Sequence, residues 1–298
     1  MSNKRQIVLL DGPVGTELSV RGVDIPAPAW SANALDTAPS VVSDIHRDYA
    51  AAGAVVHTAT TFRTRPETVG ERWEDLARLA VRLAREAVVE EQWIAGSVAP
   101  VKDCYRPDLS PGPRQARRSH KLVCDFLAEA GVDLLLCETF CSAREAQVAV
   151  ECALDTGLRT WAAFTPGPDG SLMTTAEMAA AGEEAAGAGA LAVLVNCVAA
   201  SRALPYVEAL VRAVASRHRV RVGVYANAGG MGEGLGWGAG PEGAIAHAAL
   251  ARQWVESGAS IVGGCCGTGP GHIAELRRAL AREYGLWRPP SRIARSAP

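Results

Sequence analysis

The sequence predicts an α/β protein that folds as one closed (β/α)8 barrel. Short runs of apolar and β-branched residues alternate with longer segments in which apolar residues recur every three or four positions, and this alternation repeats eight times. Strict alternation of strand and helix implies a parallel sheet, and eight repeats within 298 residues imply closure into a TIM barrel. Hydrophobic residues make up 48% of the chain, which is enough for a sizeable core.

The predicted strands are short and rich in valine, isoleucine and leucine. They cover residues 6–10, 54–58, 93–98, 132–137, 160–164, 191–196, 220–225 and 259–264. The fourth of these is an almost unbroken apolar run, as expected of a strand buried on both faces.

Amphipathic segments follow each strand and predict the helices. They cover residues 40–52, 72–91, 114–130, 142–156, 175–187, 201–217, 241–257 and 270–284. Ser40 is the expected N-cap of the first helix, Gly131 and Gly157 are expected to end the third and fourth, and Pro241 begins the seventh.

The chain shows no linker that would divide it into several domains. We expect one barrel domain over residues 1–287 and a flexible C-terminal tail over 288–298. The glycine-rich stretch 229–240 lies inside one strand–helix connection and is interpreted as an active-site loop.

Charge and hydropathy exclude several classes of function. The net charge is −2 and no basic run stands out, so no nucleic-acid partner is expected. The apolar run at residues 7–10 is too short for a signal peptide or a membrane span, and we therefore expect a cytoplasmic protein. The oligomeric state stays open.

Catalysis in such a barrel takes place at the carboxyl ends of the strands, and the residues there, mostly with polar or thiol side chains, form the candidate site. In chain order they are Asp11, Gly12, Thr58, Ser97, Glu138, Asn196, Cys197, Tyr225, Asn227, Cys265 and Cys266. We expect substrate to bind at this rim.

Three of the eight cysteines lie on the rim, namely Cys197, Cys265 and Cys266. Three thiolates in a small volume repel one another unless a cation joins them, and Zn²⁺ prefers soft thiolate ligands in tetrahedral geometry. Three protein ligands leave the fourth position open, as in catalytic zinc sites. The alternative is that they are small core residues, but the Gly-Gly-Cys-Cys-Gly setting favours a metal. The remaining cysteines are interpreted as structural: Cys104, Cys124, Cys137, Cys141 and Cys152.

The segment GGCCGTGP at 263–270, followed by His272 and Ile273, resembles the C-terminal zinc motif of the homocysteine S-methyltransferase family. LDGPVGTEL at 10–18 resembles its first strand and loop, and segments 96–100, 138–139, 196–197 and 225–229 are similar to its middle motifs. The matches run through nearly the whole chain in the expected order, and the double-cysteine motif is the most specific.

The resemblance implies zinc held by the three rim cysteines and an amino-acid thiol whose ammonium is held by Asp11 and Glu138. Two carboxylates suit an ammonium, although each could instead be a structural carboxylate paired with arginine. We expect the rest of the substrate site to comprise Gly12, Thr58, Ser97, Asn196, Tyr225 and Asn227.

The predicted function is a zinc-dependent S-methyltransferase that moves a methyl group from an onium donor to homocysteine, giving methionine. A free thiol has a pKa near ~8.5 and is a poor nucleophile until zinc removes its proton. The substrate thiolate then serves as the nucleophile, so no side chain of the protein is expected to act as one. Aromatic faces attract onium cations, which makes Phe62, Tyr225 and Trp237 candidate lining residues. The 298 residues hold no folate, cobalamin or activation domain, which favours S-methylmethionine or S-adenosylmethionine as donor.

Several alternatives remain open. The same chemistry could act on another thiol or a selenol, or the chain could be a homocysteine module working with a separate methyl-corrinoid partner. A zinc-binding barrel without turnover would not need Asp11 and Glu138. A metal-free aldolase-type barrel lacks a lysine at a strand end, since the lysines are Lys4, Lys102 and Lys121.

Overall fold

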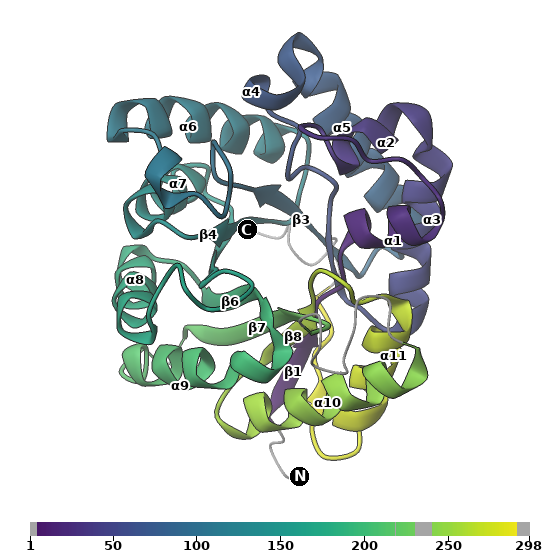
Figure 1. The fold of residues 1–298 in the computed structure, drawn as a ribbon, viewed down its shortest axis with the longest axis vertical. Coiled ribbons are helices and arrows are strands. Elements are labelled where there is room, and N and C mark those ends of the chain that lie inside the picture. Colours follow the sequence, from purple (N-terminus) through teal and green to yellow (C-terminus); the bar gives the residue numbers. More distant parts are fainter. Residues whose placement is uncertain (1–4, 218, 230–239, 291–298) are drawn as a thin grey trace.

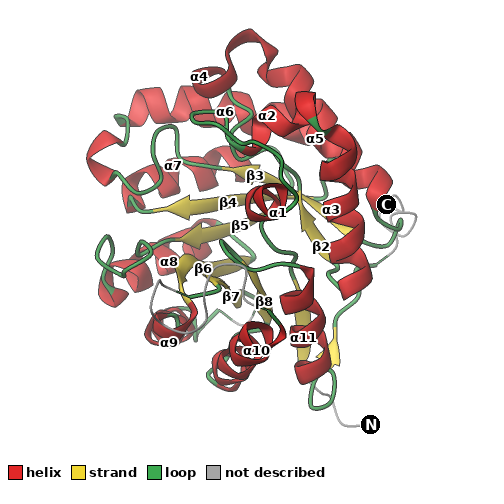
Figure 2. Cartoon of the chain, turned by 45° about the vertical axis from the view of Figure 1, so that its right-hand side comes forward, coloured by secondary structure: helices red, strands yellow, loops and turns green. Residues whose placement is uncertain are grey.

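The computed structural model describes residues 5–217, 219–229 and 240–290. Eight parallel strands form the barrel (Figures 1 and 2). They are β1 (Gln6–Leu9), β2 (Val56–Thr58), β3 (Trp93–Val98), β4 (Leu134–Phe140), β5 (Arg159–Phe164), β6 (Ala192–Ala199), β7 (Arg221–Asn227) and β8 (Ile261–Gly264). Each strand from β2 to β8 pairs with the next, and β8 pairs with β1. A bridge between Leu10 and Val56 joins β1 to β2 and closes the ring, which confirms the predicted fold class.

All eight predicted helices are present and surround the barrel (Figure 1). They are α3 (Pro39–Ala52), α5 (Trp73–Ala87), α6 (Pro113–Glu129), α7 (Ala143–Leu154), α8 (Thr175–Ala188), α9 (Leu204–Ala213), α10 (Pro241–Glu256) and α11 (Pro270–Leu280). The predicted N-cap Ser40 is wrong, because α3 begins at Pro39 and Ala38 caps it. The fixed φ of proline suits the first helical position, so the helix starts one residue earlier.

Three short helices were not predicted. They are α1 (Val14–Val20), α2 (Ser31–Thr37) and α4 (Pro66–Val69), and all three lie in strand–helix connections. The first two stand between β1 and α3, so the first connection of the barrel is far longer than a simple loop.

The strands place alternate side chains on two sides of the barrel wall. Ile7 and Leu9 of β1 pack in the layer between the sheet and the helices, whereas Val8 and Leu10 fill the barrel interior. This alternation is the two-residue period of a strand, and it builds one core inside the barrel and one around it.

The chain after α11 covers the amino-terminal end of the barrel. A short strand, β9 (Gly285–Leu286), pairs with β1, and the Trp287 ring packs edge-on against Trp93 with centroids 4.9 Å apart. The carboxyl end of the barrel therefore remains as the open end.

Two of the predicted features, the glycine-rich loop and the C-terminal tail, fall mostly on residues that the structure does not describe. Most of the predicted loop 229–240, with Trp237, and residues 291–298 of the predicted tail lie outside the described residues, so the domain division stays a prediction. Within the described ranges, no helix is both long and apolar enough to cross a bilayer.

Candidate metal centre and active site

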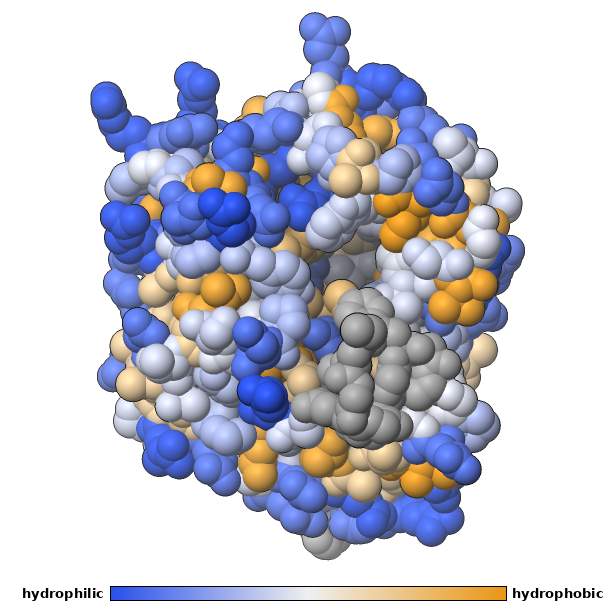
Figure 3. All heavy atoms as spheres, in the orientation of Figure 1, coloured by the Kyte–Doolittle hydropathy of each residue, from blue (hydrophilic) through white to orange (hydrophobic). Residues whose placement is uncertain are grey.

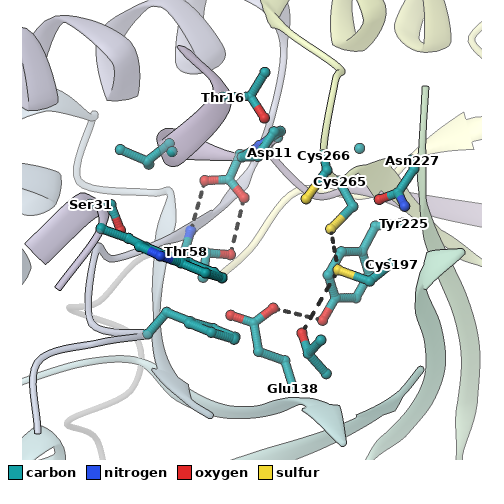
Figure 4. Close-up of a pocket in the computed structure, with 18 of the residues that line it drawn as sticks. Asp11, Thr16, Ser31, Thr58, Glu138, Cys197, Tyr225, Asn227, Cys265 and Cys266 are labelled. Atoms are coloured by element: carbon teal, nitrogen blue, oxygen red, sulfur yellow. Dashed lines mark hydrogen bonds between the residues drawn. The ribbon is translucent and has the colours of Figure 1, made fainter. Parts of the chain in front are cut away.

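The three rim cysteines meet at the open end of the barrel (Figure 4). Cys197 lies near the end of β6, and Cys265 and Cys266 follow β8 directly. The Sγ atoms of Cys197 and Cys265 are 2.7 Å apart, and all three Sγ atoms lie within 4.8 Å of one another. Tetrahedral zinc with Zn–S bonds of about 2.3 Å holds its sulfur atoms about 3.8 Å apart. The three Sγ atoms are close enough together to share one such ion, and the Cys197 and Cys265 sulfurs would move apart by about 1 Å on binding it.

Unusual backbone geometry turns Cys197 toward its partners. Its φ angle is 53°, in the left-handed region, and the pairing of β6 with β7 shifts register between Asn196 and Ala199. Thr139 at the end of β4 has a φ of 64°, and that strand also shifts its register there. Such conformations cost free energy in residues other than glycine and are concentrated at functional sites.

The two adjacent cysteines share the site because the chain turns sharply after β8. The backbone N–H of Cys265 donates to the carbonyl oxygen of Ala226 at 2.8 Å, so the hydrogen bonding between β8 and β7 extends to Cys265. The chain turns shortly afterwards, at Gly267, which has a φ of 80°. A Cβ atom on Gly263 would lie 2.9 Å from the carbonyl oxygen of Asp11, so only glycine lets β8 approach β1 this closely.

The electrostatics of the cluster favour a cation. The two neighbouring thiols and burial together raise the pKa of Cys197, because each further thiolate would repel the others. Asn196 donates from its Nδ2 to the Cys197 Sγ at 3.6 Å, a weak contact that cannot balance several negative charges. A bound cation is what would allow all three sulfurs to be deprotonated together.

Two buried carboxylates lie beside the cluster. Asp11 accepts hydrogen bonds from the Thr58 backbone N–H at 2.8 Å and from the Thr58 Oγ1 at 3.1 Å. Glu138 accepts from the Ser97 Oγ at 2.5 Å and from the Tyr225 Oη at 2.9 Å.

The carboxylates of Asp11 and Glu138 have no arginine partner among the described residues. Burial raises the pKa of both, because all their partners are neutral. The alternative of an arginine-paired structural carboxylate therefore finds no support, and both groups suit a cationic ligand.

Asp11 also belongs to a second buried group, with His46 of α3 and His57 of β2. Their ligand atoms lie within 4.8 Å of one another. Burial lowers the pKa of His46 to about 4 and that of His57 to about 3, so both imidazoles are neutral at pH 7. Neutral imidazole is the form that binds metal ions, which makes this group a second place to test for metal.

The three cysteines and the two carboxylates line a cavity of about 470 Å³ at the barrel mouth, where Figure 3 shows the surface hollowed near its centre. The predicted residues in its wall are Asp11, Gly12, Phe62, Thr58, Glu138, Tyr225, Asn227, Cys197, Cys265 and Cys266. Ser97 and Asn196 are fully buried behind the wall, where Ser97 holds Glu138 and Asn196 contacts Cys197.

Further lining residues were missed from the sequence. They are chiefly Trp30, Cys104, Tyr105 and Pro168. The sequence predicts a structural role for Cys104, yet this residue forms part of the wall. Most of these residues come from connections rather than strand ends, and the strand-end rule gave no signal for them.

Comparison with known proteins identifies the family of the chain. A profile of the family described as homocysteine S-methyltransferase matches residues 8–280, so the chain belongs to that family and is a methyltransferase. Homocysteine S-methyltransferase 1 of Zea mays is 28% identical, covering 93% of this chain and 95% of its own length. Selenocysteine Se-methyltransferase of Brassica oleracea is 27% identical, covering 94% and 90% respectively. The metallated crystal structure of the homocysteine methyltransferase MmuM from Escherichia coli superposes with a TM-score of 0.76 at 26% identity, covering 93% of this chain and 97% of that one.

Proposed function

We propose that the protein transfers a methyl group from an onium donor to homocysteine, giving methionine, with zinc held by Cys197, Cys265 and Cys266. One observation carries the proposal: three converging sulfurs stand beside two buried carboxylates without cationic partners, inside one cavity. The cluster suits a soft metal, and the carboxylates suit the ammonium of an amino acid. Homocysteine offers both a thiol and an ammonium.

Two groups of residues bind and orient the acceptor substrate: one contacts its ammonium, and the other positions the carboxylates that do so. Asp11 and Glu138 hold the substrate ammonium, while Thr58, Ser97 and Tyr225 fix the two carboxylates through the hydrogen bonds described above. Gly12 and Asn227 complete the wall of the substrate pocket. When bound, zinc would lower the pKa of the substrate thiol, so that its sulfur is held as a nucleophilic thiolate.

The substrate sulfur attacks the methyl carbon of the donor in line. A new carbon–sulfur bond forms as the bond from the methyl carbon to the onium centre breaks, and that electron pair leaves with the donor as a neutral product. No side chain needs to donate a proton in this step. The largely apolar cavity excludes water and aligns the two substrates.

We propose S-methylmethionine or S-adenosylmethionine as the donor. The relative named for selenocysteine supports a second candidate acceptor, a selenol, whose selenolate can attack the methyl carbon as a thiolate does. A separate methyl-corrinoid partner stays a further alternative for the donor. We also propose a cytoplasmic location, where the reducing environment would keep the thiols of Cys197, Cys265 and Cys266 available to the metal.

The test combines metal content with methyl transfer. The protein is purified without chelator, its metal is measured by emission spectroscopy, and homocysteine is assayed with S-methylmethionine, S-adenosylmethionine and betaine separately. Selenocysteine replaces homocysteine in a parallel series. We expect about one zinc per chain and product from one sulfonium donor.

Three variants locate the metal. Cys265→Ala should lose zinc and methyl transfer, whereas Cys124→Ala, which removes a buried thiol of α6 outside the cavity wall, should keep both. Zinc that survives in Cys265→Ala but is lost in His57→Gln would place the metal in the second buried group and refute the proposed centre. Bound zinc without turnover of homocysteine would refute the proposed acceptor or donors.

A further inference from the structure

Arg63 lies against the aromatic part of the cavity wall. It follows β2 and is only 9% exposed. Its guanidinium carbon stands 4.5 Å from the ring centre of Trp30 and 5.1 Å from that of Phe62, and both rings line the cavity. Its charge also acts on Cys104 of the same wall, where it opposes the burial that raises the pKa of that thiol to about 12.

The edge of this guanidinium has no acceptor. Among the described residues, no hydrogen bond or ion pair involves the side chain of Arg63, and its buried Nε has no partner. Stacking on Trp30 and Phe62 stabilises the flat face of the group, but arginine carries five N–H donors in its plane, and stacking leaves these unused.

Arg65, two residues further along, shows what a structural arginine looks like in this fold. It is 3% exposed, and its Nε donates to Glu67 at 3.2 Å. Its Nη atoms donate to the carbonyl oxygens of Ala99 and Pro100 and to the Ser119 hydroxyl. Every edge of Arg65 is used within the protein, whereas the edge of Arg63 is left for a ligand.

The described lining of the cavity contains no lysine, arginine or histidine, yet it contains Asp11 and Glu138 for an ammonium. Arg63 is not itself a lining residue, but its guanidinium stands directly against two residues that are, Trp30 and Phe62. An amino acid also brings a carboxylate, and the planar fork of arginine matches a carboxylate in two parallel hydrogen bonds.

We propose that Arg63 anchors the α-carboxylate of an amino-acid substrate at the wall formed by Trp30 and Phe62. This inference rests on the proposed function, because it assumes that the cavity binds an amino acid. The carboxylate comes from one of two sources, the thiol acceptor or the sulfonium donor. Arg63 is in either case a residue that selects carboxylated substrates over their uncharged analogues.

Calorimetric binding to the purified protein separates the two sources. The ligands are homocysteine and its carboxamide, and S-methylmethionine and its carboxamide, each titrated into wild type, Arg63→Met and Arg63→Lys. We expect wild type to bind the carboxylate of one pair at least about tenfold more tightly than the amide, and Arg63→Met to lose that preference. Arg63→Lys should retain part of it, because lysine keeps the charge without the fork. Arg72→Met is the matched control, since it removes an exposed arginine that pairs with Asp36, and it should leave all four affinities unchanged.

An equal affinity for acid and amide in wild type would overturn the proposal, as would a preference that persists undiminished in Arg63→Met or no binding of any of the four ligands. If Arg63→Met fails to fold by circular dichroism, Arg63→Lys decides, and an unchanged preference in that variant refutes the role. Failure of methyl transfer while the Arg63-dependent preference persists would sink the proposed function and leave this inference standing.

Discussion

At the scale of single residues, Glu138 shows how the site is prepared for a cation. The residue is only 7% exposed, and the partners of its carboxyl group are the neutral hydroxyls of Ser97 and Tyr225. Desolvation therefore raises the pKa of Glu138 in the absence of ligand. A bound ammonium would reverse this direction, because a neighbouring positive charge favours the carboxylate.

Replacing Glu138 by glutamine should weaken binding of the acceptor without unfolding the protein. The amide keeps the size of the side chain but removes its charge, so we expect the KM for the thiol to rise by roughly 10- to 100-fold, as for loss of a hydrogen bond to a charged group. Steady-state kinetics and the melting temperature measure the two effects.

Glu145→Gln is the matched control for that substitution. Glu145 is also buried, but it accepts from the Val101 backbone N–H at 2.7 Å and contacts His120, away from the cavity wall. It should lower the melting temperature and leave the KM unchanged. An unaltered KM in Glu138→Gln would show that this carboxylate does not hold the substrate.

At the scale of elements, the end of β8 is shaped by close backbone approach to β1. Gly263 pairs with Tyr225 of β7, and its missing side chain leaves room for the Leu10 and Asp11 backbone. The position of Cys265 and Cys266 therefore depends on how tightly β8 and β1 close the barrel.

Gly263→Ala should disturb both stability and metal binding. The added Cβ would meet a backbone oxygen at 2.9 Å, which forces the strands apart, and we expect a loss of about 1–3 kcal/mol in the free energy of unfolding. Zinc affinity should fall as well, because the ligands shift with the strand. Chemical denaturation and competition with a chelator measure these changes. Gly271→Ala in α11 is the control, since a Cβ there meets nothing within 4 Å, and equal effects in both variants would argue against the steric explanation.

The sequence predicted the regular elements well because their periods are long enough to recognise. β3 was predicted over its observed span, and each of the eight barrel helices was found. The short helices α1, α2 and α4 were missed because four to seven residues do not complete two turns of an apolar pattern.

The convergence of the three cysteines was predictable for a different reason, since a closed barrel brings all strand ends to one rim. The positions of Trp30, Cys104 and Arg63 were not, because they lie in connections whose path depends on tertiary packing. No local sequence pattern predicts the positive φ angles of Thr139 and Cys197 either.

At the scale of the whole molecule, the barrel buries several histidines in their neutral form. His46, His57 and His247 are fully buried, and desolvation lowers their pKa values to about 4, about 3 and about 4. In the unfolded chain a histidine titrates near ~6.5. Below that pH these histidines bind protons in the unfolded state but stay neutral in the folded state, so acid favours unfolding.

The free energy of unfolding should therefore be highest above about pH 6.5 and fall as the pH drops toward about 4. Each of these histidines contributes on the order of 1 kcal/mol per pH unit within that window, and the raised pKa values of Asp11 and Glu138 offset part of the loss. Urea denaturation of chelator-treated protein at several pH values gives the slope without competition between protons and metal. Glutamine at position 57 cannot take up a proton in the unfolded state. The free energy of unfolding of His57→Gln should therefore depend less steeply on pH than that of wild type, by about the contribution of one histidine. Identical slopes in the two proteins would mean that His57 is protonated in the folded barrel, in contradiction to its burial.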